Sequence, residues 1–373
     1  MRAGARVWWN DVTKFWALVR YDDIRFVSSN PALFSSAKGI IIPEVDGEEL
    51  IQPENLIFTD PPRHRQLRKL ISAGFTPRQV ALLADEITKI VTGIFDEIDT
   101  TREYNFAEDI AAPLPTRLIA DMLGAPSTDW EQFRHWSDAI VALNDPDIEQ
   151  DPLEAMAELY EYFLKLINLR REGVSTGKTD LLAILAAAEV DGLKLTDDDL
   201  LAFSFLLLVA GNETTRNLLA FGMLNLIENP DQFALLRSDH SLIPSAIEEM
   251  LRYNSPVAHM ARTATADVEV GGQLIKEGDR VAMLYGAANR DEDVFGDDAE
   301  EFIITRDPNP HIAFGYGEHM CLGAQLARLE ARIFFEQFLT RFSDISLVGD
   351  ITRLRATMVP GVKKMPVRLK AGA

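Results

Sequence analysis

Apolar residues recur along most of this chain at the three- to four-residue spacing of amphipathic helices. This period predicts helices near 61–75, 77–98, 107–123, 128–143, 152–172, 178–188, 197–229, 231–238, 243–253 and 322–342. The helix at 197–229 is apolar almost all round, so we expect it to cross the middle of the protein. Thr196, with Asp199 three residues later, predicts where that helix begins, and Asn229–Pro230 predicts where it ends.

Strands are predicted in two places. The segment 14–27 indicates a strand, a turn at Asp22 and Asp23 and then a short helix, and a long loop follows over 40–56. Alternating residues over 261–289 predict a small β region, whereas the tail after residue 342 has few strand signals. No repeat or linker divides the sequence, so we expect a mainly α fold with a minor β region in a single domain over residues 1–373.

Composition and charge narrow the possible functions. The chain has 37 Lys and Arg against 58 Asp and Glu, a net charge of -21, which argues against nucleic-acid binding because such proteins neutralise phosphates. The longest apolar stretch, Leu200–Gly211, is shorter than the ~18 residues of a membrane span, and the first residues lack the apolar core of a signal peptide. We therefore expect a soluble, cytoplasmic protein with no membrane span.

The only cysteine, Cys321, lies between a glycine-rich loop and the start of a helix, where N–H groups and the helix dipole stabilise a thiolate. Such a thiol can be a buried structural side chain, a nucleophile with His319 as base, a zinc ligand or a haem ligand. A nucleophile needs a third group that orients its base, and zinc needs further ligands, and the sequence offers neither at a suitable spacing. Haem iron needs only one protein ligand.

A polar stretch, Ala210–Thr215 (AGNETT), interrupts the apolar helix at 197–229. One interpretation is structural, because a threonine within a helix can bond back to a carbonyl oxygen and bend the helix. The other is functional, because a buried Glu–Thr pair at the centre of a core helix is costly unless it has a use. The residues by themselves leave both interpretations open.

The spacing Phe314-x-x-Gly317-x-His319-x-Cys321-x-Gly323 resembles the haem-ligand signature of the cytochrome P450 family at every position. The resemblance implies the P450 fold, with a long central helix over the haem, and Cys321 as the ligand of the iron of haem b. The residues of this loop that are implied to bind the cofactor are Phe314, Gly315, His319, Cys321 and Gly323.

AGNETT is similar to the oxygen-activation motif of the same family. The similarity implies that Ala210 and Gly211 leave room for O2 and substrate over the haem. It further implies that Thr214 donates a hydrogen bond to the oxygen and that Glu213 relays protons from solvent, because cleavage of the O–O bond requires protons. Glu213 and Thr214 are therefore the expected catalytic residues.

A further acid–base pair, Glu249 and Arg252, is spaced by one helical turn. Taken alone, such a pair is usually a surface ion pair worth roughly 0.2–0.5 kcal/mol. Here it resembles the family's E-x-x-R motif, which braces the core on the haem side, and Arg306 is a candidate third member.

Haem carries two propionates, on which cations and imidazoles are expected to converge. The residues in matching positions are His64, Arg68, Arg262 and His319, each of which alone would be an ordinary surface residue. The cluster Arg63, Arg65 and Lys69 is either a solvated helix face or a docking patch for an acidic ferredoxin. We expect no fused reductase domain, so the resemblance implies electrons from NAD(P)H through a ferredoxin-type partner and its reductase.

The resemblance extends from about Trp16 to Val367 and includes the segments DPPRH, EVDG, AGNETTRN, EEMLR and ANRD. The N-terminus is shorter than usual for the family, so we expect its first helix to be missing, which concerns the roof of the substrate channel rather than the haem site. The expected substrate pocket is apolar and consists of Leu206, Val209, Ala210, Val257, Ala258, Met358 and Val359. His259 either donates a hydrogen bond to a polar end of the substrate or faces solvent.

The sequence thus predicts a haem-thiolate monooxygenase that inserts one oxygen atom from O2 into a C–H bond of a hydrophobic molecule. It resembles bacterial members that act on sterols, terpenoids or branched lipids. The alternatives are a peroxide-driven peroxygenase, a non-catalytic haem-binding sensor and an all-helical scaffold whose motifs are accidental. The intact Glu213–Thr214 pair argues against the first two, because it serves proton delivery.

Overall fold

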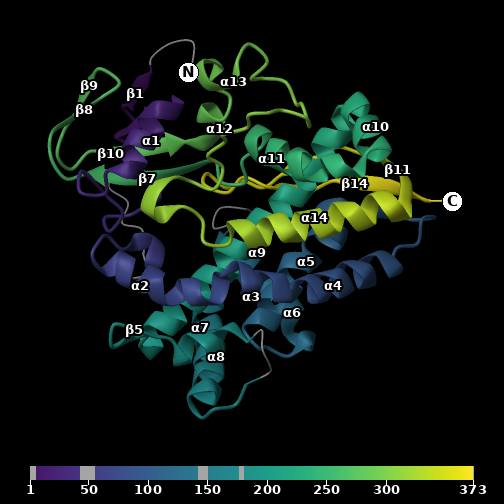
Figure 1. Ribbon diagram of the computed structural model, residues 1–373, viewed down its shortest axis with the longest axis horizontal. Coiled ribbons are helices and arrows are strands. Elements are labelled where there is room, and N and C mark those ends of the chain that lie inside the picture. Colours follow the sequence, from purple (N-terminus) through teal and green to yellow (C-terminus); the bar gives the residue numbers. More distant parts are fainter. Residues whose placement is uncertain (1–5, 43–54, 142–149, 176–179, 373) are drawn as a thin grey trace.

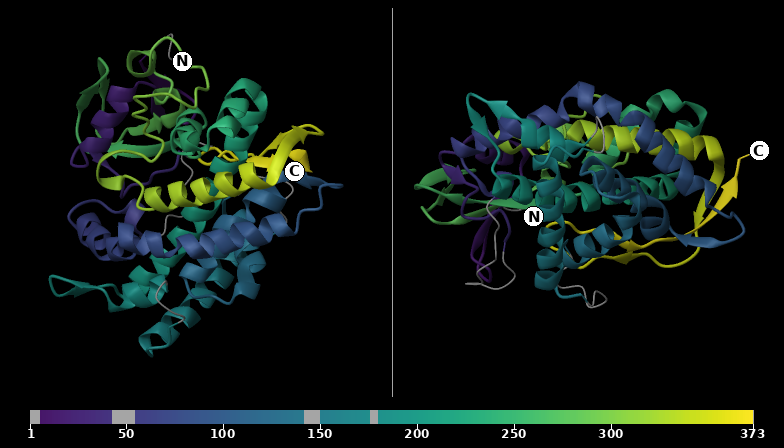
Figure 2. Two further views of the ribbon diagram at one scale, coloured as in Figure 1. Left: turned by 45° about the vertical axis from the view of Figure 1, so that its right-hand side comes forward. Right: turned by 90° about the horizontal axis from the view of Figure 1, so that it is seen from below.

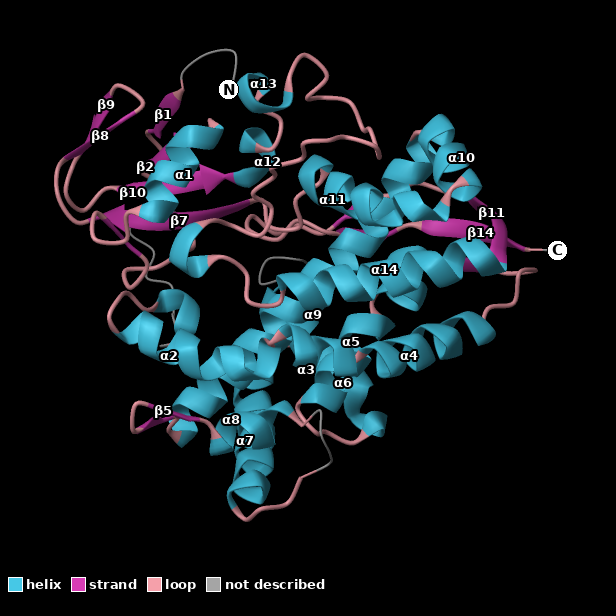
Figure 3. Ribbon diagram, viewed as in Figure 1, coloured by secondary structure: helices cyan, strands magenta, loops and turns pink. Residues whose placement is uncertain are grey.

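The structure is a computed structural model that describes residues 6–42, 55–141, 150–175 and 180–372. Helices form most of it, and the larger sheets lie at two sides of the helical body (Figure 1; Figure 3). The described helices are α1 (Tyr21–Ser29), α2 (Arg63–Ile71), α3 (Pro77–Leu82), α4 (Ala84–Asp96), α5 (Pro113–Met122), α6 (Trp130–Val141), α7 (Pro152–Arg171), α8 (Leu181–Ala187), α9 (Asp197–Glu228), α10 (Pro230–Ser238), α11 (Ile243–Tyr253), α12 (Tyr285–Ala288), α13 (Glu292–Phe295) and α14 (Ala324–Arg341). The prediction of a mainly α fold with a minor β region is confirmed.

One sheet joins the N-terminal segment to a segment far along the chain. Its strand order is β1-β2-β10-β7-β3; β10 runs parallel to β2, and the other neighbours are antiparallel. The strands are β1 (Val7–Asn10), β2 (Phe15–Leu18), β3 (Phe34–Ser35), β7 (His259–Ala264) and β10 (Arg280–Leu284). The sheet therefore fixes the strand that carries Arg262 between β10 and β3.

The tail of the chain contains more strands than its sequence indicates, so the prediction of a strand-poor tail is wrong. β11 (Phe342–Leu347) pairs with β14 (Pro366–Ala371), which pairs with β4 (Glu103–Asn105). Two buried residues of β14, Val367 and Leu369, are too few to signal a strand, and β4 lies far away in the sequence. The remaining strands form hairpin pairs: β5 (Glu189–Val190) with β6 (Leu193–Lys194), β8 (Val268–Val270) with β9 (Gln273–Ile275), and β12 (Thr352–Arg353) with β13 (Val362–Lys364).

Several element boundaries differ from the prediction. The turn predicted at Asp22 and Asp23 is wrong, because both residues lie in the first turn of α1, where the helix dipole favours carboxylates. The helix predicted over 77–98 is divided between α3 and α4, and the one predicted over 107–123 begins as a π-helix before Pro113 starts α5. Residues 43–54 of the predicted loop, including the EVDG segment, lie outside the described residues.

The long helix α9 begins and lies as its sequence predicts. The hydroxyl of Thr196 accepts from the N–H of Asp199 at 3.1 Å, and the Asp199 carboxylate accepts from the N–H of Thr196 at 3.0 Å. α9 packs against α5, α6, α7, α11 and α14, and every residue over 215–226 is buried, so its second half is surrounded by the core (Figure 2). Among the described residues, no helix combines the length and the apolar character needed to cross a membrane.

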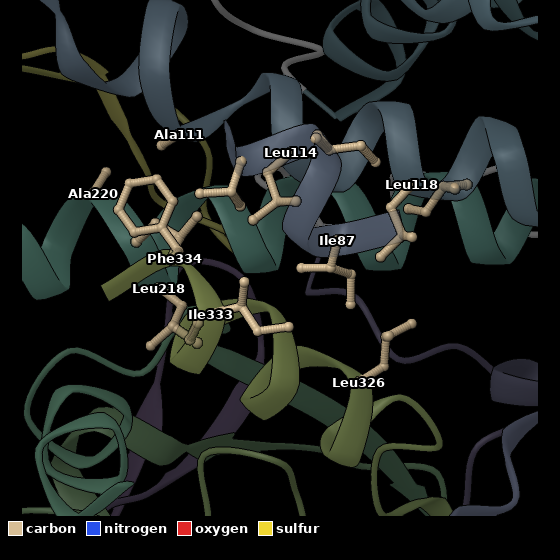
Figure 4. Packing of buried hydrophobic residues seen from close by; sticks show 14 of the residues in the cluster. Ile87, Ala111, Leu114, Leu118, Leu218, Ala220, Leu326, Ile333 and Phe334 are labelled. Carbon is tan, nitrogen blue, oxygen red and sulfur yellow. The ribbon is translucent and has the colours of Figure 1, made fainter. Parts of the chain in front are cut away.

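The main hydrophobic core fills the space between α4, α5, α9 and α14. Figure 4 shows side chains of these helices meeting there, among them Ile87 of α4, Leu118 of α5 and Leu218 of α9. Phe334 of α14 contacts Phe95 of α4 edge-to-face, with 5.2 Å between ring centroids. Such an aromatic pair contributes about 0.5–1.5 kcal/mol beyond its buried area. The core therefore fixes α14, the helix that follows Cys321, against α4 and α9.

A buried ion pair ties α11 to the segment that leads to the cysteine loop. Arg252 donates to both carboxylate oxygens of Glu249 at 2.7 Å and to carbonyl oxygens within the segment 289–301. Neither side chain is exposed, and the Nε of Arg306 lies 3.4 Å from the Glu249 carboxylate. Removal of one partner from such a pair costs about 3–5 kcal/mol, because the other charge stays buried. The pair therefore makes the approach to the cysteine loop rigid.

Glu330 of α14 gives stability a pH dependence that can be measured. Its side chain is buried, Oε2 has no hydrogen-bond partner among the described residues, and burial raises its pKa to about 8. A carboxyl with a raised pKa binds its proton more tightly in the folded state, so stability falls as pH rises from the unfolded pKa of about 4.3 to about 8. We expect E330Q to gain stability relative to the native chain over this interval, by at most about 1.4 kcal/mol per pH unit.

Chemical denaturation at both ends of that interval measures the difference. The matched control is E336Q on the same helix, whose native carboxylate pairs with Arg332 on the exposed side. A stability difference between E330Q and the native chain that does not change with pH would contradict the assignment.

Candidate active site

The loop around Cys321 is closed by backbone hydrogen bonds and held against α1. The N–H of Cys321 donates to the carbonyl of Phe314 at 2.8 Å, and that of Gly315 donates to the carbonyl of Ile312 at 2.9 Å. Gly317 has a φ of +73°, and a Cβ there would lie 2.4 Å from the carbonyl oxygen of Ser28 at the end of α1. No other residue type fits both the backbone angle and this close approach. The glycine therefore sets where the loop lies.

Cys321 is an exposed residue, although many protein atoms lie around its thiol. Burial raises the pKa of Cys321, while the N–H of Gly323 and the charges of Arg68 and Arg328 lower it. The stabilisation expected from the helix N-terminus is present in the Gly323 N–H, but burial outweighs it. A thiolate at this place therefore needs positive charge beyond that of the protein, such as a bound metal ion.

Four basic groups predicted to meet do lie together. The rings of His64 and His319 are 4.1 Å apart, and the His319 Nε2 lies 3.2 Å from the hydroxyl of Ser36. Burial is the main cause that lowers the pKa of His64, Arg68, Arg262 and His319, and for His319, at about 2, the charges of Arg262, His64 and Arg68 lower it further. Neither nitrogen of His64 has a hydrogen-bond partner among the described residues. Buried donors without partners and mutually repelling cations suit a bound anion.

The polar stretch Ala210–Thr215 does not interrupt α9, and one side of the helix is exposed there. Ala210 is exposed although it lies in the middle of α9, and Thr214, one turn later, is half-buried. The Thr214 hydroxyl donates to the carbonyl of Ala210 at 2.6 Å, which is the back-bonding that the structural interpretation expects. A Cβ on Gly211 would lie 2.8 Å from the Cδ1 of Ile119, so this glycine allows α5 to approach α9.

Glu213 points away from the exposed side of α9. Its side chain is buried, its Oε1 accepts from Arg216 at 3.2 Å, and its Oε2 has no partner among the described residues. Two further carboxylates, Glu108 and Asp138, lie 3.4 Å from the same guanidinium. The expected catalytic pair is thus divided between two environments: Thr214 lies toward the open side, and Glu213 belongs to a buried acidic cluster.

The residues expected in the substrate pocket come from three segments, two of which contact each other. The N–H of Ala258 donates to the carbonyl of Met358 at 2.8 Å, which joins the loop of Val257 to the one that contains Val359. Val359 is buried and Val257, Ala258 and Met358 are partly buried. On α9, Leu206 and Val209 are partly buried beside the exposed Ala210.

His259 follows this loop and does not face solvent, so that alternative is wrong. The residue is 9% exposed, it hydrogen-bonds the backbone of Thr357, and its Nε2 has no partner among the described residues. The predicted basic cluster of α2, by contrast, is paired with acidic residues at or near the surface. Arg63 pairs with Asp199, Arg65 with Glu318 and Lys69 with Asp191.

Comparison with known proteins shows which family the chain belongs to. The sequence model of the cytochrome P450 family matches residues 116–347. The chain belongs to the cytochrome P450 family. It is 38% identical over 361 residues to the methyl-branched lipid omega-hydroxylase of Mycobacterium tuberculosis, covering 94% of this chain and 83% of that protein. It is 35% identical over 388 residues to the steroid C26-monooxygenase of Rhodococcus jostii, covering 100% of this chain and 81% of that protein.

Solved P450 structures have the same fold. Substrate-free CYP109E1 from Bacillus megaterium superposes with a TM-score of 0.91 at 35% identity, covering 100% of this chain and 97% of the other. The same enzyme in complex with testosterone gives a TM-score of 0.88 at 36% identity, covering 99% and 97%. CYP268A2 of Mycobacterium marinum in complex with pseudoionone gives 0.88 at 39% identity, covering 98% and 92%. The chain is therefore an oxygen-incorporating oxidoreductase of the P450 family, whose cofactor is haem.

The residues beside Cys321 fit this cofactor. A haem supplies an iron for the Cys321 thiol and two carboxylates for the buried basic groups, among which both ring nitrogens of His64 lack a hydrogen-bond partner in the described residues. Whether each predicted residue touches haem stays a prediction.

The sequence analysis did not identify Arg328, whose charge also lowers the pKa of the Cys321 thiol. Arg328 lies 4.6 Å above the ring of Phe314, donates to both oxygens of Glu248 at 2.7 Å, and lowers the pKa of Cys321. His311 lies 2.9 Å from the same carboxylate, and the two basic partners lower the pKa of Glu248 to about 2 although burial alone would raise it. One signal was available: Arg328 follows Cys321 by seven residues, which is two helical turns.

Replacement of Arg262 tests the anion site. We expect R262L to weaken haem retention about tenfold or more, because a charged hydrogen bond contributes about 1.5–3 kcal/mol. The haem-free form should not lose stability in parallel, because Arg262 repels its basic neighbours there. Haem transfer to apomyoglobin measures retention, and thermal unfolding of the haem-free protein measures stability. R332L, on the exposed side of α14, is the control; equal retention in R262L and R332L would contradict the anion site.

Proposed function

We propose that this chain hydroxylates C–H bonds of hydrophobic small molecules of the steroid, terpenoid or branched-lipid class, with O2 as the oxidant. The observation that carries the proposal is the Cys321 loop, in which an exposed cysteine lies beside buried basic groups. This arrangement provides one protein ligand for iron and counter-charges for two propionates, which is what a haem-thiolate enzyme requires.

Bound haem with a thiolate ligand supplies the chemistry that favours O–O cleavage. The chain itself holds the cofactor and moves protons. In the proposal, Cys321 is the iron ligand, Arg68 and Arg262 neutralise the propionates, and His64 and His319 complete their hydrogen bonds. The loop residues Phe314, Gly315 and Gly323 and the helix residues Ala210 and Gly211 would contribute to holding the cofactor.

Proton delivery is assigned to Thr214 and Glu213. The Thr214 hydroxyl now donates to the carbonyl of Ala210, so a turn about χ1 frees it to donate toward the open side of α9. Glu213 has one carboxylate oxygen without a partner among the described residues, which is free to bind and release a proton. The two groups together can carry a proton inward without leaving a permanent charge on the open side.

The substrate class rests on the apolar residues and on the relatives. Leu206, Val209 and Ala210 of α9, with Val257, Ala258, Met358 and Val359, offer hydrocarbon surface, as suits a hydrophobic ligand. The relatives' names state a methyl-branched lipid and a steroid as substrates, and the B. megaterium enzyme was solved with testosterone. The unpartnered Nε2 of His259 is suited to a polar group at one end of such a molecule.

Electrons are proposed to come from NAD(P)H through a ferredoxin and its reductase. The basic residues of α2 are suited to an acidic partner once they exchange their present carboxylates. Arg65 and Lys69 are exposed, and their ion pairs with Glu318 and Asp191 are of the surface kind, worth about 0–1 kcal/mol. Such pairs are readily replaced by a partner's acids.

The CO difference spectrum of the haem-loaded, dithionite-reduced protein is the first test. A strongly red-shifted Soret band is expected for the native chain, and C321S should lose that shift while its fold is retained. Product is then sought with a surrogate ferredoxin, its reductase, NADPH and isotopically labelled O2, using a steroid, a terpenoid and a branched fatty acid. Label in a hydroxylated product supports the proposal. A red-shifted band without product under O2, but with product from peroxide, would instead indicate a peroxygenase, and no turnover at all a sensor.

Thr214 and its neighbour Thr215 form a matched pair for testing proton delivery. T214A should lower product formed per NADPH by about tenfold and release peroxide, because a positioned proton donor is lost. T215V changes a threonine that is buried on another side of α9, and it should keep the native ratio. The measurement is the ratio of product formed to NADPH consumed, together with the amount of peroxide released. Equal ratios in T214A and T215V would show that Thr214 does not deliver protons.

A further inference from the structure

Three carboxylates from three elements surround one buried guanidinium. The Nη1 of Arg216 lies 3.2 Å from Glu213 Oε1 and 3.4 Å from Asp138 Oδ1, and its Nη2 lies 3.4 Å from Glu108 Oε1. Glu213 and Arg216 belong to α9, Asp138 to α6, and Glu108 to the π-helix Phe106–Ala111. Arg134 of α6 pairs with Glu108 at 2.6 Å. The acids therefore exceed the guanidinium groups by one, which favours a proton on one of the carboxyls.

The cluster runs from the surface to the interior. The side chains of Glu108 and Asp138 are 26% and 24% exposed, whereas those of Glu213 and Arg216 are 2% and 3% exposed. The Oε2 of Glu213 is buried and has no hydrogen-bond partner among the described residues. A buried carboxylate oxygen without a donor is costly, so it either binds a proton or receives a hydrogen bond from an entering group.

We propose that Asp138 is the outer carboxyl of a proton path that supplies Glu213, and that Arg216 holds both carboxyls in position. This inference rests on the proposed function, which needs protons at the open side of α9. In the transfer, the O–H bond of the Asp138 carboxyl breaks and the proton passes, directly or through one water, to a Glu213 carboxylate oxygen. Asp138 then takes a proton from solvent, so no oxidant or reductant is involved.

Three observations favour Asp138 over Glu108 as the donor. Burial and the charges of Glu213 and Glu108 raise the pKa of Asp138 to about 7, although Arg216 and Arg134 lower it. A group with a pKa near the working pH is best suited to both bind and release a proton. Glu108, in contrast, is engaged by two guanidinium groups, those of Arg134 and Arg216. Asp138 and Glu213 also share a single donor nitrogen, which keeps them close together.

A purely structural role makes a different prediction. If the cluster only clamps α6 to α9, then loss of one negative charge should act alike at either rim carboxyl. D138N and E108Q each remove one charge beside Arg216 and keep the shape of the side chain. Only D138N removes the proposed proton carrier. A comparison of the two variants therefore distinguishes a role in proton transport from a role in holding α6 against α9.

The test uses the haem-loaded chain with the surrogate ferredoxin system. We expect D138N to slow O2-dependent product formation about tenfold, to raise peroxide release and to increase the solvent isotope effect, because proton supply becomes limiting. When hydrogen peroxide replaces O2 and the electron donors, D138N should form product at the same rate as the native chain. The native O2-dependent rate should fall as pH rises through about 7, and D138N should lack this fall. E108Q should change these quantities less than about twofold.

An infrared titration needs no turnover. The native chain should show the carbonyl stretch of a protonated carboxyl that disappears near pH 7, and D138N should lack this band but keep the separate one of Glu330. In E108Q the band should remain but disappear at a lower pH, because the charge of Glu108 raises the pKa of Asp138. Equal defects in D138N and E108Q, or a D138N defect that persists with peroxide, would overturn the inference. If the native chain makes no product from O2, the proposed function fails by itself. The infrared band then still decides whether Asp138 carries the proton, and its absence from the native spectrum overturns that assignment.

Discussion

Burial of like charges beside a single thiol is the constraint on which the site depends. Burial, followed by the charges of Arg262 from β7 and of His64 and Arg68 from α2, lowers the pKa of His319 in the cysteine loop to about 2. A buried cluster of basic side chains is stable only where a bound anion neutralises its charge and accepts its hydrogen bonds. The fold therefore has to hold these elements together against their repulsion.

The scaffold meets this constraint through rigid contacts. The N-terminal sheet places β7, and Gly317 lets the cysteine loop rest on the end of α1. The buried Glu249–Arg252 pair fixes the segment that leads into the loop, and the aromatic contacts of Phe334 fix the helix that leaves it. A ligand set mounted on elements this well packed is held within a narrow range of positions, as a cofactor with a single covalent attachment requires.

α9 separates two electrostatic environments. Successive residues of a helix point about 100° apart, so the adjacent Glu213 and Thr214 lie on different sides of it. The side of Thr214 and Ala210 is open, while the side of Glu213 and Arg216 joins an acidic cluster that reaches the surface at Asp138. Cations near the thiol suit an anionic cofactor, and carboxyls behind the helix suit transport of protons. The helix thus places the residues of one polar stretch in two separate environments.

The sequence alone determined the helical character, the limits of α9, and the loop that presents Cys321, because helical periodicity, capping and positive-φ glycines are local properties. It also named the four basic residues, through a resemblance whose motif spacing is unusually specific. Only the tertiary structure decided the strands of the tail, since β14 pairs with the distant β4. It alone placed Asp138 beside Arg216 and Arg328 above Phe314, and it alone showed that burial raises the pKa of Cys321. Burial and cross-chain contacts depend on which distant segments pack together, and no local pattern records that choice.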